Sequence, residues 1–278
     1  MKTDLSGRVA LVSGAARGQG RSHAVALAEA GADIIAFDLC DRVAGVAYEP
    51  ATEDDLAETA RQVESLDRRI VAEKADVRNW KEVYDVVEHG VAALGRLDIV
   101  AANAGICGPP TPTEEITDEA FVNMQQINVI GMWRTCKAAI PHLRASGDGG
   151  SMILTSSAAG LIPYANISDY VVSKHGVVGL MRVLALELAP HRIRVNSVHP
   201  TTVATDMVLN DATYQLFRPD LSNPNREDFA QAATEMNALP VPWVESSDIT
   251  NAVVFLASDA ARFITGVTLP VDAGATIK

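Results

Sequence analysis

Residues 8–31 carry the pattern that most restricts the fold: an apolar segment, a glycine-rich turn and an alanine-rich helix in direct succession. The apolar segment, residues 8–12, has the length and composition of a buried strand. The turn, residues 13–20, follows at once, and the helical pattern after it stops at Gly31. Glycines in such a turn let the backbone N–H groups of a helix start approach a pyrophosphate. The pattern predicts a parallel α/β sheet that binds a dinucleotide.

The second predicted strand, residues 33–37, indicates which dinucleotide binds, because it ends at Asp38. A carboxylate at this point accepts hydrogen bonds from both adenosine ribose hydroxyls and repels a 2′-phosphate. Asp38 therefore predicts NAD rather than NADP. The glycine spacing is G-x-x-x-G-x-G rather than the better-known G-x-G-x-x-G, so the glycines alone are a weak sign of a dinucleotide. Arg17 in the turn can also approach a 2′-phosphate, which leaves NADP as the alternative.

A tyrosine and a lysine four residues apart suggest the chemistry. On a helix, Tyr170 and Lys174 lie on one face and converge on one small volume. A phenol has a pKa near ~10, and a neighbouring ammonium lowers that pKa toward neutral pH. Ser157 follows a predicted strand at residues 152–154 and can hydrogen-bond a substrate oxygen there. These residues predict an acid–base site for an alcohol or a carbonyl, although such a pair is often only an exposed structural one.

Charge and cysteine content exclude several classes of protein. The net charge of -12 over 278 residues disfavours nucleic acid and anionic membranes as partners. Cys40, Cys107 and Cys136 are odd in number and have no C-x-x-C spacing, so we expect neither disulfides nor a metal site. No apolar run is long enough to span a bilayer. We expect a single domain, residues 1–278, in a reducing cytoplasm.

Five motifs together resemble the classical short-chain dehydrogenase/reductase family: the turn, the segment 102–105, Asn128, Ser157 and Tyr170-x-x-x-Lys174. The resemblance covers nearly the whole chain. It implies a Rossmann fold, a single doubly wound parallel sheet with helices on both faces. It also implies that Tyr170 removes the hydroxyl proton, Ser157 holds the same oxygen, and Lys174 grips the nicotinamide ribose. Asn128 would anchor a water that links the lysine to solvent.

The implied cofactor site draws on the carboxyl ends of most strands. Asp76 has an alternative role as the N-cap of a helix beginning near Asn79. This chain has Pro200-Thr201 where most relatives have Pro-Gly, and His199 is expected to be a structural hydrogen-bonder. The implied cofactor contacts are Gly14, Arg17, Gly18, Gln19, Gly20, Asp38, Leu39, Asp76, Val77, Asn103, Ala104, Gly105, Tyr170, Lys174, Pro200, Thr202, Val203 and Thr205.

Residues 39–52 form an extra loop where most relatives turn directly into the next helix. This loop, together with residues 199–203, looks like the carveol-dehydrogenase-like, mycofactocin-associated branch of the family. The branch implies NAD held tightly beneath the loop and re-oxidised in place by a separate redox carrier. The alternative is a plain surface insertion, which backbone entropy tolerates well.

Residues 203–244 contain no clear strand and several prolines, and we interpret them as a substrate lid. We expect oxidation of a hydrophobic, terpenoid-like secondary alcohol of the carveol type to a ketone. The alternatives are a freely NAD(H)-exchanging dehydrogenase or ketoreductase on steroid, sugar or acyl substrates, and a non-catalytic nucleotide sensor. The lid's apolar residues favour a hydrophobic substrate unless they pack only within the lid: Met207, Val208, Leu209, Leu216, Phe217, Phe229, Met236, Leu239 and Trp243.

A long helix is predicted over residues 118–145, with Asn128 in its middle. A polar amide there indicates either surface exposure or a local bend. This helix and the one at residues 170–188 have more than one apolar face, which suggests burial between subunits and a homotetramer.

Overall fold

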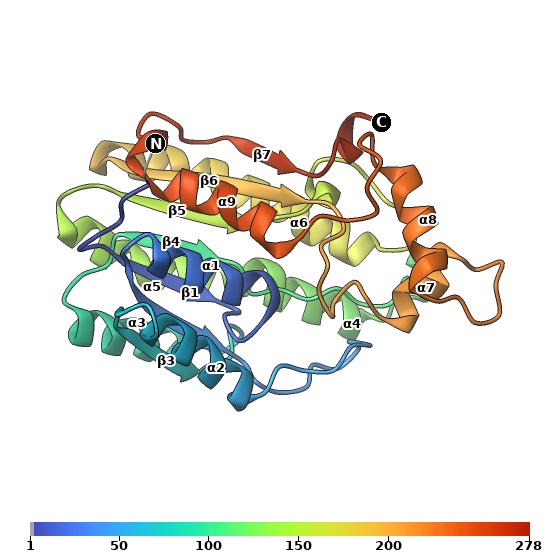
Figure 1. The fold of residues 1–278 in the computed structure, drawn as a ribbon, viewed down its shortest axis with the longest axis horizontal. Helices are drawn as coiled ribbons and strands as arrows, with labels where there is room; N and C mark the ends of the chain where they lie inside the picture. The colour runs from blue at the N-terminus through green and yellow to red at the C-terminus, as the bar shows by residue number, and fades with distance from the viewer. Residues whose placement is uncertain (1–2) are drawn as a thin grey trace.

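Seven parallel strands form the sheet of this protein, whose computed structural model describes residues 3–278 (Figure 1). Their order is β3-β2-β1-β4-β5-β6-β7, and the direction of winding reverses between β1 and β4. Ligands of such sheets bind at this switch point, outside the carboxyl ends of the strands. The predicted doubly wound sheet is confirmed. The strands are β1 (Val9–Ser13), β2 (Asp33–Asp38), β3 (Ile70–Lys74), β4 (Ile99–Ala102), β5 (Gly150–Thr155), β6 (Ile193–Pro200) and β7 (Thr268–Val271).

Helices cover both faces of the sheet (Figure 1). α1, α2 and α9 pack on one face, and α3, α5 and α6 pack on the other. α7 and α8 lie beyond the carboxyl ends of the strands. The helices are α1 (Gly18–Glu29), α2 (Glu53–Glu64), α3 (Trp80–Leu94), α4 (Asp118–Gln125), α5 (Met132–Ser146), α6 (Ser168–Leu188), α7 (Asp211–Phe217), α8 (Arg226–Met236) and α9 (Ser246–Ala257).

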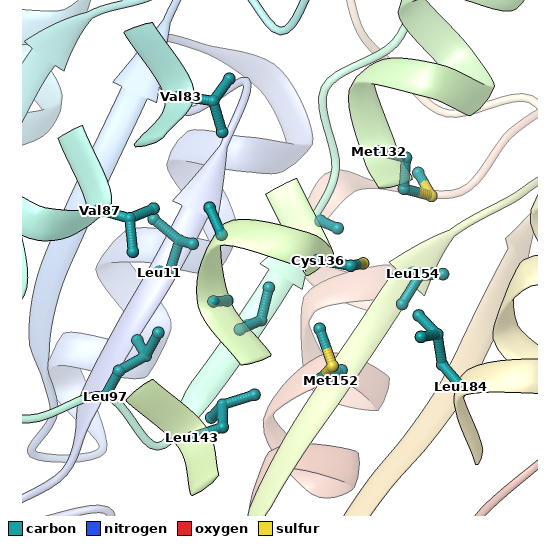
Figure 2. Packing of buried hydrophobic residues seen from close by; sticks show 14 of the residues in the cluster. Leu11, Val83, Val87, Leu97, Met132, Cys136, Leu143, Met152, Leu154 and Leu184 are labelled. Carbon is teal, nitrogen blue, oxygen red and sulfur yellow. The ribbon is translucent and has the colours of Figure 1, made fainter. Parts of the chain in front are cut away.

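The central strands β1, β4 and β5 are largely apolar because both of their faces are covered. In β1, Leu11 joins the cluster under α3, α5 and α6, whereas Ala10 and Val12 join the cluster on the opposite face. Figure 2 shows Leu11 among side chains of the first cluster, which include Val87 of α3 and Cys136 of α5. The two cores hold the strand ends, and therefore the loops beyond them, in fixed positions.

The long helix predicted over residues 118–145 is helical throughout, but its middle is not an α-helix. Residues Gln126–Gly131 between α4 and α5 form a π-helical segment. Asn128 lies in this segment and is fully buried. Of the two expectations for the amide, surface exposure is wrong and a local irregularity of the helix is observed. A π-helical turn carries one extra residue, and such turns are frequent at functional sites.

The predicted lid contains two helices that the sequence analysis did not identify, α7 and α8. Their N-termini are capped by the side chains of Asn210 and Asn225. The expectation of no strand holds apart from one isolated bridge, Val203 to Val244. No helix among residues 3–278 is long and apolar enough to cross a membrane.

Candidate active site

The glycine-rich turn between β1 and α1 is closed by the protein's own backbone. Gly14 has a φ of +68°, in the left-handed region, and a Cβ there would lie 2.8 Å from the Cα of Ala104. A Cβ on Gly20 would lie 1.8 Å from the carbonyl oxygen of Gly14. The sequence explained these glycines by the close approach of a phosphate. The structure gives a first reason of its own, because the protein's backbone leaves no room for a Cβ at either position. Even without a ligand, the turn admits no side chain at these two positions.

The first turn of α1 is suited to an anion. The helix starts after Arg17 with no side-chain cap and no acidic residue in its first turn. The N–H groups that begin a helix lack intrahelical acceptors, and the helix dipole adds positive potential there. This helix start faces the same cleft as Asp38 and so fits the pyrophosphate of a dinucleotide.

Asp38 ends β2 at the rim of the cleft, as predicted. Its Oδ2 accepts a hydrogen bond from the backbone N–H of Ala16 at 2.9 Å, which fixes the carboxylate beside the turn. Arg17, the residue that argued for a 2′-phosphate, pairs with Asp206 at 2.8 Å. Its charge is thus already matched by a carboxylate, and the adenosine end of the cleft fits NAD better than NADP.

Asp76 and Val77 line the cleft beyond β3. The alternative reading of Asp76 as the N-cap of the following helix is wrong. Asn79 caps α3 by accepting a hydrogen bond from the backbone N–H of Lys81 at 3.0 Å. Asp76 instead pairs with Arg78 at 2.7 Å.

The segment after β4 is tied to the end of β1. The Ser13 hydroxyl accepts hydrogen bonds from the N–H groups of Asn103 and Ala104 at 3.0 and 3.1 Å. A Cβ on Gly105 would lie 3.2 Å from the Asn128 side chain and 3.5 Å from the Lys174 ammonium. These small residues therefore bring the cleft floor close to the lysine.

Ser157, Tyr170 and Lys174 come together at the end of the cleft. Lys174 Nζ donates to the carbonyl oxygen of Thr155 at 3.1 Å and lies 5.5 Å from the centre of the Tyr170 ring. The Ser157 side chain interacts with the phenol and lowers its pKa. The Ser156 hydroxyl donates to the carbonyl oxygen of Lys174 at 2.9 Å, which fastens α6 to the end of β5. The exposed structural pair considered from the sequence is excluded, because Lys174 is only 4% exposed.

The electrostatics of this group differ from the expectation that Lys174 lowers the pKa of Tyr170. Burial of the phenol raises the pKa of Tyr170, and the nearby Cys107 raises it further, whereas the hydrogen bond from Ser157 lowers it. Loss of water around the phenolate thus outweighs the favourable contacts. Burial also lowers the pKa of Lys174 to about 8, so the amine remains largely protonated at pH 7.

Two predicted site residues do not line the cleft. Asn128 lies behind it, where its Oδ1 accepts from the N–H of Ile106 and its Nδ2 donates to the carbonyl of the same residue, both at 2.9 Å. The amide also donates to the Ser173 hydroxyl at 3.1 Å and so links α6 to the cleft floor. Thr202 turns toward the base of the lid, where its hydroxyl donates to the carbonyl of Pro242 at 2.9 Å. All other predicted contacts line the cleft.

His199 is the structural hydrogen-bonder that was predicted. Its Nδ1 bonds the carbonyl oxygen of Ser157 at 2.7 Å, and its Nε2 bonds the Ser197 hydroxyl at 2.8 Å. Burial lowers the pKa of His199 to about 4, so the ring is neutral at physiological pH. The imidazole holds the Ser157 backbone in place.

The loop at residues 39–52 supplies part of the cleft wall, and Tyr48 is a lining residue that the sequence analysis did not single out. Its hydroxyl is buried, and burial raises the pKa of the phenol. Cys107 raises the pKa of both Tyr48 and Tyr170, which puts the loop near the reaction centre. Tyr48 is the one aromatic residue of the loop, and this feature of the sequence could have marked it as a lining residue. The loop residues that line the cleft are Leu39, Asp41, Arg42, Val43, Val46, Tyr48, Pro50 and Ala51.

The lid contributes less to the cleft than its apolar composition suggested. Phe229 is fully buried within the lid and packs against Phe217, Tyr214 and Trp243, with ring centres 4.9, 5.4 and 5.8 Å away. Of the nine apolar lid residues named from the sequence, only Met207 and Val208 line the cleft. Packing within the lid, the alternative raised from the sequence, therefore accounts for Phe217, Phe229 and Trp243.

The cleft runs from Asp38 to Tyr170 across the switch point of the sheet and holds about 570 Å³. With its glycine-rich turn, the carboxylate at the end of β2 and a tyrosine and a lysine lining one cleft, the protein belongs to the short-chain dehydrogenase/reductase family. A family model described as enoyl-(acyl carrier protein) reductase matches residues 14–276.

Individual relatives are similar over essentially their full length. The (-)-trans-carveol dehydrogenase of Rhodococcus erythropolis is 56% identical over 274 residues, 99% of each chain. The crystal structure of carveol dehydrogenase from Mycobacterium avium in complex with NAD is 54% identical with a TM-score of 0.98, covering 99% of this chain and 100% of that one. A short chain dehydrogenase from Mycobacterium paratuberculosis bound to NAD is 46% identical with a TM-score of 0.91, at the same coverage.

These comparisons confirm the predicted family, the carveol-dehydrogenase-like branch, the class of enzyme and NAD as the cofactor. The protein is an alcohol oxidoreductase of the short-chain type.

Proposed function

We propose that this protein oxidises a hydrophobic, terpenoid-like secondary alcohol to a ketone and holds its NAD tightly beneath the loop at residues 39–52. The observation that carries the proposal is the group formed by the partly buried Ser157 and Tyr170 and the buried Lys174 at the end of a dinucleotide-sized cleft. Residues of the loop and of the lid also line this cleft.

In this reaction NAD supplies the hydride acceptor. Tyr170 accepts the proton of the substrate hydroxyl, and Ser157 hydrogen-bonds the same oxygen. Lys174 would hold the nicotinamide ribose. Because burial raises the pKa of Tyr170, the phenol needs added positive charge nearby to act as a base at neutral pH. The proposed relay through Asn128 requires a water beside the Ile106 backbone that this amide holds.

The substrate class rests on two kinds of support. The relative that is 56% identical is named (-)-trans-carveol dehydrogenase, and carveol is a terpenoid alcohol. In this chain the apolar side chains of Ile106, Met207 and Val208 line the cleft along with Tyr170. An apolar wall beside a few hydrogen-bonding groups suits an alcohol with a hydrocarbon body.

Tight retention of NAD is supported by the position of the loop, which reaches from Asp38 to the neighbourhood of Tyr170. A cofactor held in this way is re-oxidised in place, and we propose a separate redox carrier such as mycofactocin for that step. The alternative is free exchange of NAD(H) with steroid, sugar or acyl substrates.

Two measurements test this function. The purified protein is examined by mass spectrometry for bound nucleotide, and alcohols are then assayed with an artificial electron acceptor.

A variant tests the mechanism. Tyr170→Phe should keep NAD binding and lose turnover by a factor of roughly 10²–10⁴, the range for a general acid–base group. Retained activity in this variant excludes the mechanism. Protein that arrives without nucleotide and turns over freely with added NAD supports the exchanging alternative.

We also propose that residues 1–278 act as one domain, with residues 203–244 as its substrate lid, and that the enzyme is a cytoplasmic homotetramer. The free thiols of Cys40, Cys107 and Cys136 are compatible with a reducing compartment. The long helices support assembly, since Trp133 of α5 and Leu186 of α6 are 43% and 80% exposed.

A further inference from the structure

Arg17 connects three segments that lie far apart in the sequence. Its Nη1 donates to Asp206 Oδ2 at 2.8 Å, across 189 residues. Its Nη2 donates to the backbone carbonyl oxygen of Glu49, across 32 residues. Its guanidinium also lies over the ring of Tyr48, 5.8 Å from the ring centre. One side chain therefore joins the glycine-rich turn, the loop and the start of the lid.

The segments that Arg17 joins both line the cleft. Tyr48 belongs to the loop at residues 39–52, and Asp206 follows Thr205 at the start of the lid; all three residues line the cleft. Arg17 itself precedes the first turn of α1, where the pyrophosphate is expected. Arg17 therefore holds two segments of the cleft lining together, and their separation would widen the space around a bound cofactor.

We propose that the Arg17–Asp206 ion pair is a latch that slows the release of NAD. This inference rests on the proposed function, because it concerns a cofactor held in the same cleft. Asp206 is a positioning residue: by pairing with Arg17, which also bonds the loop, it keeps the start of the lid close to the loop. The bond of Arg17 to Glu49 keeps the loop in place whether the latch is open or closed.

The size of the effect follows from the exposure of the pair. The side chains of Arg17 and Asp206 are 23% and 69% exposed; because Arg17 is mostly covered, we place the pair in the upper part of the range for exposed ion pairs, at ~0.4–1 kcal/mol. Opening of the latch should therefore speed NAD release by a factor of about 2–5, since ~1.4 kcal/mol corresponds to tenfold. Salt screens such pairs, so the effect should shrink as ionic strength rises.

The test uses the holoenzyme and Asp206→Asn, which removes the charge and keeps the size of the side chain. The bound cofactor is reduced with an alcohol substrate, and loss of bound NADH fluorescence is followed after mixing with excess NAD. At low salt, release from Asp206→Asn should be about 2–5 times faster than from the unmodified protein. High salt should raise the release rate of the unmodified protein and leave that of the variant nearly unchanged. Asp206→Glu, which keeps the charge, should restore slow release.

The lid offers a matched control. Arg218 and Asp220 form an ion pair of the same length, 2.8 Å, with side chains 23% and 60% exposed. Neither residue lines the cleft, so Asp220→Asn should leave the release rate unchanged. Equal rates for the unmodified protein and Asp206→Asn at low salt overturn the latch, as does an equal acceleration by Asp220→Asn. Fast NADH release from the unmodified protein would contradict tight retention. The ratio of the release rates of Asp206→Asn and the unmodified protein would still test the latch.

Discussion

Lys174 should lower the stability of this fold at neutral pH, because its charge is buried. The side chain is 4% exposed, and burial lowers the pKa of its amine from 10.5 to about 8. At pH 7 the folded protein therefore carries an ammonium that loses most of its hydration. Replacement by methionine keeps the length of the side chain and removes the charge. We predict that Lys174→Met abolishes alcohol oxidation and makes the protein more stable.

The magnitude follows from the pKa. At 1.36 kcal/mol for each pKa unit, a fall from 10.5 to about 8 corresponds to ~3 kcal/mol of destabilisation. The variant also loses the hydrogen bond from Nζ to the carbonyl oxygen of Thr155, and such a loss costs about 1 kcal/mol. The expected gain in the free energy of unfolding at pH 7 is therefore about 2 kcal/mol.

The pH dependence fixes the sign of this effect. Below pH 8 the amine is protonated in both the folded and the unfolded chain, so the destabilisation is fully present. Between pH 8 and 10.5 the unfolded chain binds more protons than the folded one at this group, and stability rises with pH. The advantage of Lys174→Met should therefore be constant up to about pH 8 and shrink above it.

Urea unfolding from pH 6 to 9.5, followed by circular dichroism, measures this difference. The control is Lys81→Met on α3, where the lysine side chain is 81% exposed and pairs with Asp85. The control should change stability by less than about 0.5 kcal/mol. A Lys174→Met variant that is less stable than the unmodified protein at pH 7, or whose advantage grows above pH 8, refutes the assignment of a costly buried charge.

Two further predictions concern the cofactor and the assembly. Asp38→Asn keeps an acceptor for the Ala16 N–H and removes the charge; NADP should then compete better, and an unchanged ratio of kcat/KM for NAD and NADP contradicts the role of Asp38. Leu186→Asp places a charge on the 80%-exposed apolar position of α6. Light scattering at micromolar concentration should show a tetramer for the unmodified protein and smaller species for this variant, whereas a monomeric unmodified protein rules out the tetramer.

The sequence alone was sufficient for the features that depend on neighbouring residues. A strand, a glycine-rich turn and a helix in succession predict the first β1–α1 unit, and a strand that ends in Asp38 predicts a carboxylate at the sheet edge. The spacing of Tyr170 and Lys174 places both residues on one face of α6. Such patterns are readable because backbone geometry repeats at fixed periods along the chain.

Features that depend on distant residues were missed or misjudged. The lid's aromatic residues suggested a substrate wall, but composition does not say whether Phe229 faces the cleft or its own lid. Thr202 was assigned to the cofactor, yet Pro242 draws its hydroxyl to the base of the lid. The amide of Asn128 left exposure and a local bend open, and only the structure shows a π-helical turn with hydrogen bonds from this side chain to Ile106 and Ser173.

The chemical groups of this protein were thus determined by its sequence, and their environment was decided by the tertiary structure. Periodicity and spacing identify a phenol and an amine on one helix and a carboxylate at a strand end. Only the packed fold buries Lys174 and partly buries Tyr170, and the loss of water around them shifts both pKa values toward the neutral forms. Only the fold brings Arg17 to Asp206 and Glu49. Burial and long-range contacts are properties of the whole packed chain, so no local pattern encodes them.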